Sequence, residues 1–440
     1  MNLIIRDTTL VSAHATQTVL THRDLVVQGD LITEIRHHEN EPKRDESDYR
    51  ILDGSRWIIL PGLVNSHAHT YMAYFRNYGS GLNLHDWLFS KIFPAEGRLS
   101  QEDCAWGTAM GLLEMLRGGI TSVCDMPLMP ASAMTFVEES GMRVATGHSV
   151  FQTEFNPPRC QTIFSHFEEA YAAYHNRGNG RMKVFATVHS GYLYPPETLA
   201  EGAAWLQQQG YRVHTHLHET RKEVEDDLRL YGKRPIQRFA ELGLLGPQHV
   251  AAHCLHLNEQ DRALLSEYQM LAVPCPTSNL RLAAGIPQFT AMKNAGMSVA
   301  LGTDGQSSGN GMNLWKEMHL ASLLASVQSD DPGALTDCEV LQMVTSTPAN
   351  KLFAEKGERM GVLETGAKAD LIAISTDAPH FIALNDPLSA VVHHTLPSDV
   401  VLAMVDGELL MEKGQFTKLD EERIRYEVEQ RTSILLDGLR

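Results

Sequence analysis

The stretch Lys183–Glu219 carries the pattern that decides the fold. It reads KVFATVHSG, then YLYPPETLAEGAAWLQQQG, then YRVHTHLHE. The outer pieces are short and rich in β-branched residues, as strands are, whereas the middle piece spaces its apolar residues as one face of a helix does. A strand, a helix and a second strand in this order predict one βα unit of a parallel sheet.

The same alternation of strand-like and helix-like patterns recurs along the central part of the chain. We identify eight strand-like runs with helical stretches between them: residues 58–69, 119–126, 142–150, 183–191, 211–219, 249–257, 270–279 and 297–305. Eight such units predict the α/β class and a closed (β/α)₈ TIM-like barrel. An open doubly wound sheet is the rival, but the Gly-rich phosphate turn expected after its first strand is missing.

The two ends of the chain have a different sequence pattern. Residues 1–58 and 362–420 hold short β-branched runs separated by Gly and Asp turns, which predicts a small β-sandwich domain formed by both ends. The barrel then spans 59–361, and 421–440 form a C-terminal helix. We expect this helix to be exposed and amphipathic, which favours a homo-oligomer, either a dimer or a tetramer.

Bulk properties narrow the class of protein. The formal net charge of −17 argues against nucleic acid and against an anionic membrane as partners. No run is long and apolar enough to span a bilayer, and the N-terminus lacks the pattern of a signal peptide. Six widely spaced cysteines without a CxxC pair fit reduced thiols. We therefore expect a cytoplasmic enzyme.

Several of the eight runs end in chemically capable side chains, and barrel enzymes build their sites at the carboxyl ends of strands. His67 and His69 share one face of the first strand, because residues i and i+2 of a strand point the same way. Together with one histidine of HTHLH and Asp304, they offer three nitrogens and one carboxylate. That set suits Zn²⁺ or Fe²⁺ with a position left open for water, and it leaves His253 and Glu219 as acid–base groups.

The order of these motifs resembles that of a known family. PGLVNSHAHT, HLHET, AAHCLHL, NLRLAAGIP and VALGTDG are similar to motifs of the amidohydrolase superfamily. Within it, they resemble the S-adenosylhomocysteine/5′-methylthioadenosine deaminases, which are related to triazine hydrolases and cytosine deaminases. The resemblance covers almost the whole chain. It implies one divalent metal ion per chain, with Zn²⁺ as first choice and Fe²⁺ as alternative, bound by His67, His69, His216 and Asp304.

The resemblance also implies a reaction. Glu219 would donate a proton to a ring nitrogen, while His253 would orient the attacking water and, with Asp304, take its proton. Attack on the carbon that bears the amine would then release ammonia. The expected protein is thus a metal-dependent hydrolytic deaminase of a small aminated heterocycle, with an adenosine-type nucleoside such as adenosine, 5′-methylthioadenosine or S-adenosylhomocysteine first among the substrates.

The assignment of substrate-binding residues rests on fewer positions that match the family's motifs. The resemblance places Glu96, after the Trp87–Leu88 segment, on the ribose hydroxyls, and His189 on the ring or the ribose. It also makes Trp87 a substrate residue. His148 stands where relatives acting on adenosylhomocysteine carry an Arg, and a His cannot clamp a carboxylate bidentately. Arg159 offers a replacement cation, but we favour the simpler interpretation of it as an exposed loop residue.

Three alternatives stay open at this point. The same metal set serves deaminases or dechlorinases of other rings, such as guanine, pterin, cytosine or s-triazine. A cyclic amide hydrolase is a second alternative, which the HxxE pattern disfavours because protonating a ring nitrogen is a need of deaminases. A metal-free binding or scaffold protein is the third, and the intact set of acid–base and ligand residues argues against it.

The three histidines of HTHLH share one face of their strand, so only their height along it separates them. We expect His214 one layer deeper, as a hydrogen-bonded core histidine. His216 would lie at the level of the metal, and His218 at the rim, near the substrate. Glu219 would face the other way, so it reaches the pocket only where the strand ends or bulges at about His218.

Overall fold

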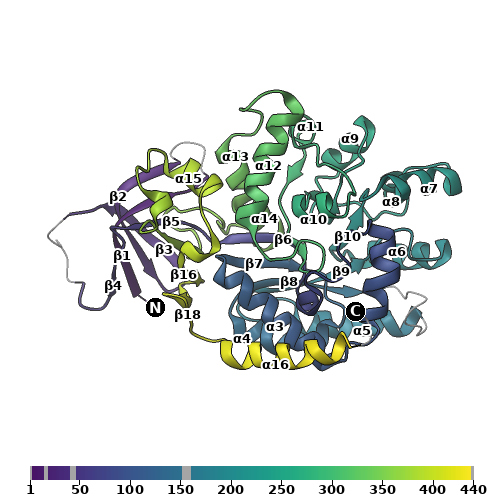
Figure 1. Cartoon of the computed structure of the whole chain (residues 1–440), viewed down its shortest axis with the longest axis horizontal. Coiled ribbons are helices and arrows are strands. Elements are labelled where there is room, and N and C mark those ends of the chain that lie inside the picture. Colours follow the sequence, from purple (N-terminus) through teal and green to yellow (C-terminus); the bar gives the residue numbers. More distant parts are fainter. Residues whose placement is uncertain (1, 14–17, 40–45, 151–159, 438–440) are drawn as a thin grey trace.

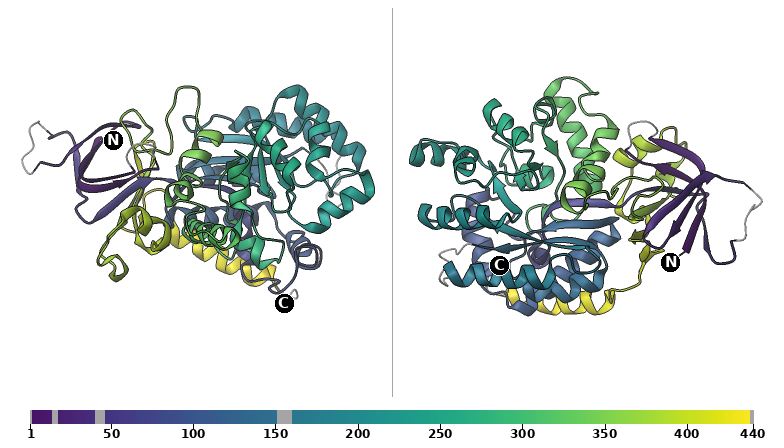
Figure 2. Two further views of the ribbon diagram at one scale, coloured as in Figure 1. Left: turned by 90° about the horizontal axis from the view of Figure 1, so that it is seen from above. Right: turned by 180° about the vertical axis from the view of Figure 1, so that it is seen from behind.

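A computed structural model describes residues 2–13, 18–39, 46–150 and 160–437, with the side chains of 160–162 left aside. Arg159 lies outside the described residues. The chain forms a barrel of parallel strands and helices with a small β domain at one side (Figures 1 and 2). The N-terminus belongs to the small domain, and the C-terminal helix runs back beneath the barrel.

The central strands form one closed parallel sheet. Its order is β13-β12-β11-β10-β9-β8-β7-β6-β14, and β13 and β14 belong to the same passage of the chain, so the sheet closes on itself. This confirms the expected (β/α)₈ barrel. The strands are β6 (Leu63–His69), β7 (Ile120–Asp125), β8 (Arg143–Ser149), β9 (Met182–Val188), β10 (Val213–Leu217), β11 (Val250–His253), β12 (Leu271–Val273), β13 (Ser298–Val299) and β14 (Asp304–Gly305).

Two of the eight predicted runs are each divided in the structure. Residues 58–69 form two strands, because β5 (Trp57–Pro61) pairs with strands of the small domain before the chain enters the barrel as β6. The change of sheet occurs at Gly62, where a Cβ atom would lie 2.1 Å from Thr121 Oγ1, so only glycine fits. Residues 297–305 divide because the closing passage pairs first with β12 and then with β6.

Helices surround the barrel, and further short helices follow the strand ends (Figure 1). They are α1 (Leu84–Trp87), α2 (Phe93–Glu96), α3 (Gln101–Arg117), α4 (Pro130–Ser140), α5 (Cys160–Tyr174), α6 (Pro196–Gln209), α7 (Arg221–Tyr231), α8 (Pro235–Glu241), α9 (Glu259–Glu267), α10 (Pro276–Arg281), α11 (Phe289–Asn294), α12 (Leu314–Ser329), α13 (Asp337–Gln342), α14 (Ser346–Leu352), α15 (Pro387–His393) and α16 (Glu421–Leu435), with η1 (Thr70–Phe75), η2 (Leu88–Ile92), η3 (Pro379–Phe381) and η4 (Pro397–Asp399). Among the described residues, no helix combines the length and the apolar character needed to cross a membrane.

The C-terminal helix α16 is partly buried, unlike the exposed helix expected from the sequence. It packs along α3, where Arg431 bonds Asp103 (2.9 Å) and Glu102 (2.6 Å). Ile424 and Val428 of α16 are buried. The face of α16 that carries Ile424 and Val428 therefore packs on the barrel, whereas Tyr426 and Ile434 are exposed.

Both chain ends contribute to the small domain. Its mixed sheet has the order β18-β17-β16-β15-β5-β1-β2-β3, with β4 paired to β1. The sheet folds back on itself, because one apolar cluster contains residues of β1 to β3 and of β15 to β17. The strands are β1 (Asn2–Val11), β2 (Val19–Gln28), β3 (Leu31–His37), β4 (Arg50–Asp53), β15 (Leu371–Ser375), β16 (Val400–Val405), β17 (Glu408–Glu412) and β18 (Gln415–Phe416).

A buried ion cluster joins the small domain to the barrel. Arg143, at the start of β8, donates to both oxygens of Asp370 (2.5 and 3.0 Å) and to Asp406. All three side chains are largely buried, so this bidentate pairing fixes the junction at the amino ends of the strands. The opposite, carboxyl ends of the strands are left for the functional site.

Candidate active site

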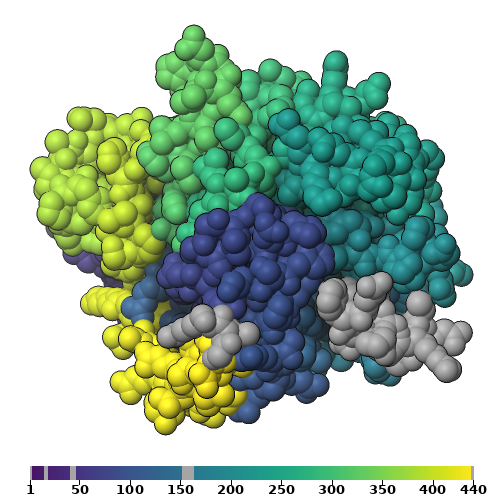
Figure 3. All heavy atoms as spheres, turned by 45° about the vertical axis from the view of Figure 1, so that its right-hand side comes forward, coloured from purple at the N-terminus to yellow at the C-terminus, as the bar shows by residue number. Residues whose placement is uncertain are grey.

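A cavity of about 630 Å³ opens at the carboxyl ends of the barrel strands. The segment that carries α1, η2 and α2, dark blue in Figure 3, lies across the middle of this face. Most of the predicted site residues line the cavity: His69, Trp87, Glu96, His148, His189, His216, Glu219, His253 and Asp304. His67 is fully buried just behind its wall.

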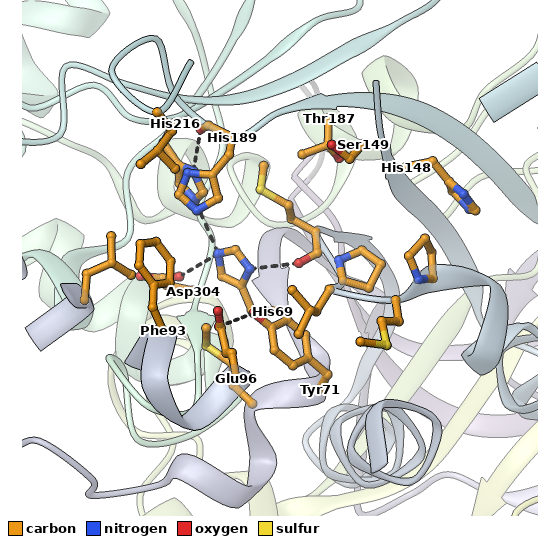
Figure 4. Close-up of a pocket in the computed structure, with 18 of the residues that line it drawn as sticks. His69, Tyr71, Phe93, Glu96, His148, Ser149, Thr187, His189, His216 and Asp304 are labelled. Atoms are coloured by element: carbon orange, nitrogen blue, oxygen red, sulfur yellow. Dashed lines mark hydrogen bonds and ion pairs between the residues drawn. The ribbon is translucent and has the colours of Figure 1, made fainter. Parts of the chain in front are cut away.

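The expected metal ligands come together at one end of the cavity (Figure 4). The Nε2 atoms of His67 and His69 lie 3.5 and 3.4 Å from Asp304 Oδ1. His69 Nε2 also lies 3.3 Å from Nε2 of His216. His67, His69 and Asp304, and likewise His67, His216 and His253, place their ligand atoms within 4.8 Å of one another.

The other ring nitrogen of two of the expected ligand histidines has a fixed partner. His69 Nδ1 donates to the carbonyl of Met126 (2.8 Å), and His216 Nδ1 donates to the carbonyl of His189 (2.7 Å). A carbonyl can only accept, so Nδ1 carries the proton in both rings and Nε2 presents a free lone pair inward. This is the outer-shell arrangement that orients histidines toward a metal ion.

The donor set fits a divalent metal ion. His67 Nε2 is buried and has no hydrogen-bond partner among the described residues, which is costly unless something else binds there. Burial lowers the pKa of His67 and His216, which keeps both rings neutral. Although burial acts to raise the pKa of Asp304, His67 and His69 hold it well below its usual value. Neutral imidazoles and a carboxylate are the forms that bind metal.

In the structure, the three histidines of HTHLH have different environments. His214 is fully buried, and its Nε2 bonds His67 Nδ1 (2.8 Å), which confirms the expected core histidine. The expectation for His218 is wrong, because its side chain is fully buried away from the cavity. His218 Nδ1 donates to the carbonyl of His256 (3.1 Å), and Nε2 accepts from the amide of Ile236 (3.1 Å).

Glu219 reaches the cavity as the sequence requires, by a break at the end of β10. The strand ends at Leu217, and His218 has a φ of 55°, which turns the next residue inward. Glu223, which sequence reasoning missed, holds this turn by accepting from the amides of His218 (3.1 Å) and Glu219 (2.7 Å). Burial, with the nearby charges of Asp304 and Glu223, raises the pKa of Glu219 well above its usual value. The raised pKa favours the protonated, acid form of Glu219.

His253 faces Glu219 across the cavity, with Nε2 3.4 Å from Glu219 Oε1. Burial lowers the pKa of His253 to about 3, so its ring is neutral. Its φ is 72° and that of Asp304 is 60°. Left-handed backbone at non-glycine residues costs on the order of 1–3 kcal/mol each and gathers at functional sites. Here it occurs where β10, β11 and the last barrel strand turn functional side chains inward.

The first turn of α10 and the turn after β14 supply further contacts that the sequence did not reveal. Ser278 Oγ donates to Asp304 Oδ2 (2.6 Å), and Ser308 Oγ donates to the same oxygen (2.9 Å). Asn279 Nδ2 lies 2.9 Å from His253 Nδ1. None of these residues belongs to a ligand spacing. Only the position of PCPTSN at the end of a strand run could have pointed to Ser278 and Asn279, and Ser308 follows the last barrel strand.

Another part of the cavity wall comes from α1 to α2. Trp87 is buried there, and Glu96 accepts a hydrogen bond from the Tyr71 hydroxyl (2.5 Å). Burial raises the pKa of Glu96 to about 7. His148 lies at the other end of the cavity from Asp304 (Figure 4). Its buried Nε2 has no partner among the described residues, and burial lowers its pKa to about 4.

Comparison with known proteins gives relatives over nearly the full chain. A 5-methylthioadenosine/S-adenosylhomocysteine deaminase of Caldanaerobacter subterraneus subsp. tengcongensis is 35% identical over 438 residues, covering 100% of this chain and 99% of that protein. A deaminase of the same name from Symbiobacterium thermophilum is 37% identical over 366 residues, covering 82% and 83%.

Solved structures share the fold. An adenosine deaminase from Xanthomonas campestris with bound zinc has a TM-score of 0.90 and 26% identity, covering 99% of this chain and 98% of that one. An atrazine chlorohydrolase from Arthrobacter aurescens TC1, complexed with zinc, has a TM-score of 0.87 at 22% identity, covering 98% and 100%. At that identity, the likeness shows the fold alone.

The profile of the amidohydrolase family matches residues 58–410, which include the whole barrel and most of the C-terminal part of the small domain. Together with the full-length relatives, this match settles the family. The chain belongs to the amidohydrolase family.

Proposed function

We propose that this protein is a metal-dependent deaminase that releases ammonia from an adenosine-type nucleoside. One observation carries the proposal: Glu219, buried and with its pKa raised well above the usual value, lines the same cavity as the cluster of three histidines and one carboxylate. Deamination of a ring needs both a nucleophilic water and an acid that protonates the ring nitrogen. The names of the relatives support the same reaction.

The metal would be held by His67, His69, His216 and Asp304, with Zn²⁺ as first choice and Fe²⁺ as alternative. When bound there, a divalent ion lowers the pKa of a bound water toward neutrality and so supplies a nucleophile. Zinc in the related adenosine deaminase supports the first choice.

The chain's own residues would handle the protons. Glu219 gives its proton to the ring nitrogen next to the carbon that bears the amine. Asp304 takes one proton from the attacking water and passes it to the amine, which leaves as ammonia when its bond to carbon breaks. The second proton of the same water returns to Glu219, so both carboxyl groups are restored. His253 orients the water beside them.

The remaining wall residues would select the substrate. A carboxylate at Glu96 suits the two ribose hydroxyls, Trp87 and His189 would contact the ring or the ribose, and His148 would face the 5′ substituent. Among the described residues that line the cavity there is no Lys or Arg. This favours an uncharged substituent, and hence adenosine or 5′-methylthioadenosine over S-adenosylhomocysteine.

An ammonia-release screen of the purified, metal-loaded protein tests the proposal. Adenosine, 5′-methylthioadenosine and S-adenosylhomocysteine form the main arm, with guanine, a pterin, cytosine and an s-triazine as the arm for other rings. We expect turnover in the main arm. Turnover confined to another ring, or no ammonia from any compound, would contradict the proposal.

Three coarser expectations also remain proposals. We propose a cytoplasmic enzyme that forms a dimer or tetramer, supported by the exposed Tyr426 and Ile434 on α16 and measurable by light scattering. We also propose the domain division 1–58 with 362–420, 59–361 and 421–440, which limited proteolysis can test.

A further inference from the structure

The segment Pro274–Asn279, PCPTSN, links the end of β12 to the first turn of α10. It contacts Asp304 and His253, the two groups that we propose act on the attacking water. Ser278 bonds Asp304, and Asn279 bonds His253, and both side chains are fully buried. The segment therefore lies behind the chemistry without lining the cavity.

The orientation of the Asn279 amide is fixed from its other end. The backbone N–H of Cys275 donates to Asn279 Oδ1 (3.1 Å). An N–H donor must face the amide oxygen, so the amide NH₂ faces His253 Nδ1 at 2.9 Å. An NH₂ group only donates, and thus His253 Nδ1 must accept. A neutral imidazole has one N–H, which then lies on Nε2.

We propose that Asn279 is a positioning residue that holds His253 in the tautomer with its proton on Nε2. The inference rests on the proposed deaminase function and deepens it. Nε2 is the nitrogen that faces the cavity, 3.4 Å from Glu219 Oε1. His253 therefore enters the reaction as a hydrogen-bond donor that orients the water, and it has no lone pair there with which to take a proton.

The assignment leaves the proton of the water to Asp304. Oδ2 of Asp304 already accepts from Ser278 and Ser308, so Oδ1 is the oxygen that faces the histidines. The sequence had given His253 a share in removing this proton. The hydrogen bonds of PCPTSN instead divide the work: Asn279 makes His253 a donor, while Ser278 aims the carboxylate that accepts.

The first test reads the tautomer directly and needs no substrate. Nitrogen-15 NMR of histidine-labelled protein distinguishes a protonated from an unprotonated ring nitrogen, and the signal lost in His253→Gln identifies the residue. We expect a protonated Nε2 and an unprotonated Nδ1 in the unsubstituted protein. A proton on Nδ1 would overturn the inference, whether or not the protein deaminates nucleosides.

The second test inverts the hydrogen bond. Asn279→Asp has nearly the same shape but offers only acceptors, so it draws the proton to Nδ1. We expect kcat to fall by about 10²- to 10⁴-fold, the scale known for a catalytic histidine held in the wrong tautomer, with KM within about threefold and metal content unchanged. Asn258→Asp is the matched control, since Asn258 caps α9 as an acceptor and Asp caps equally well.

A double variant separates positioning from general support of the fold. In a His253→Gln background, Asn279→Asp should cost less than about threefold, because its effect runs through the ring that is gone. An equal loss in both backgrounds, or an Asn279→Asp enzyme with unchanged kcat, would overturn the inference. Failure of the proposed function would look different, because the unsubstituted protein would then release no ammonia.

Discussion

The two walls of the cavity are built differently. On the metal side, the outward Nδ1 atoms of His69 and His216 each bond a backbone carbonyl, and Asp304 Oδ2 accepts from two serines. On the substrate side, Glu96 accepts from the Tyr71 hydroxyl, and His148 Nε2 has no partner among the described residues. Inward-facing atoms are left over on both sides: His67 Nε2 is left for a metal ion, whereas His148 Nε2 is left for a substrate.

The difference indicates which substitutions should affect catalysis and which should affect substrate binding. Hydrogen-bonded partners and left-handed backbone preorganise the metal wall, so no reorganisation is needed during the reaction. The substrate wall is apolar apart from a few polar atoms, as is typical of sites that recognise small molecules. Substitutions in the first wall should therefore change kcat or metal content, and substitutions in the second should change KM.

The largest effect is expected at the metal wall. His216→Ala removes a proposed ligand whose Nδ1 is already held by the His189 carbonyl. We expect metal affinity to fall by more than about 100-fold, since even the outer partners of metal ligands are worth 10- to 100-fold. Elemental analysis and ammonia release should fall together. His218→Ala, in the same strand end but outside the cavity, is the comparison; metal loss only in that variant would reverse the ligand assignment.

The next effect concerns the turn that aims Glu219. Glu223→Ala leaves the amides of His218 and Glu219 without their acceptor, at about 1–3 kcal/mol for each buried group. We expect kcat to drop roughly 10- to 100-fold with metal retained, because the acid is misplaced while the ligands are not. Glu223→Gln keeps one acceptor oxygen and should lie between. An unchanged kcat in Glu223→Ala would show that the turn holds its shape without this carboxylate.

A smaller effect is expected at Glu96. Burial raises its pKa to about 7, so it is a neutral acid below that pH and a carboxylate above it. A carboxylate accepts hydrogen bonds from two hydroxyls, so KM for the nucleoside should fall as pH rises from 6 to 8. Glu96→Gln should raise KM about tenfold, remove this pH dependence and leave kcat nearly unchanged. A loss of kcat instead would place Glu96 in the chemistry.

The smallest effect is expected at His148, at the end of the cavity away from Asp304. His148→Phe removes one neutral hydrogen-bonding atom, which is worth about 2- to 10-fold in KM. Steady-state kinetics with adenosine and 5′-methylthioadenosine should show that kcat is kept. If metal content or kcat collapsed, the separation of the two walls would be wrong.

The sequence predicted the parts of this molecule that repeat or alternate. Period two placed His67 and His69 on one face, and the order of βα units predicted the barrel. It could not divide residues 58–69 or 297–305, because an apolar run does not reveal a change of hydrogen-bonding partner. It also placed His218 at the rim, because strand geometry was continued past Leu217, where a left-handed residue ends it.

Supporting residues were the main omission. Glu223 accepts from the backbone amides of His218 and Glu219, and Asn279 bonds a ring nitrogen of His253, which lies 26 residues earlier in the chain. No spacing rule links Asn279 to His253. The helix α16 was expected to be exposed, since its pattern is amphipathic; the pattern is correct, but the partner of its apolar face is α3. Periodicity identifies a face and does not identify what covers it.

The measurement that tests the central claim most directly is made on Glu219→Gln, with metal content and ammonia release determined on the same sample. Gln keeps the shape of the side chain but cannot donate a carboxylic proton. We predict about one divalent metal ion per chain, as in the unsubstituted protein, and a loss of ammonia release of at least about 10²-fold. Full turnover in this variant, or loss of the metal with the acid, would contradict the account.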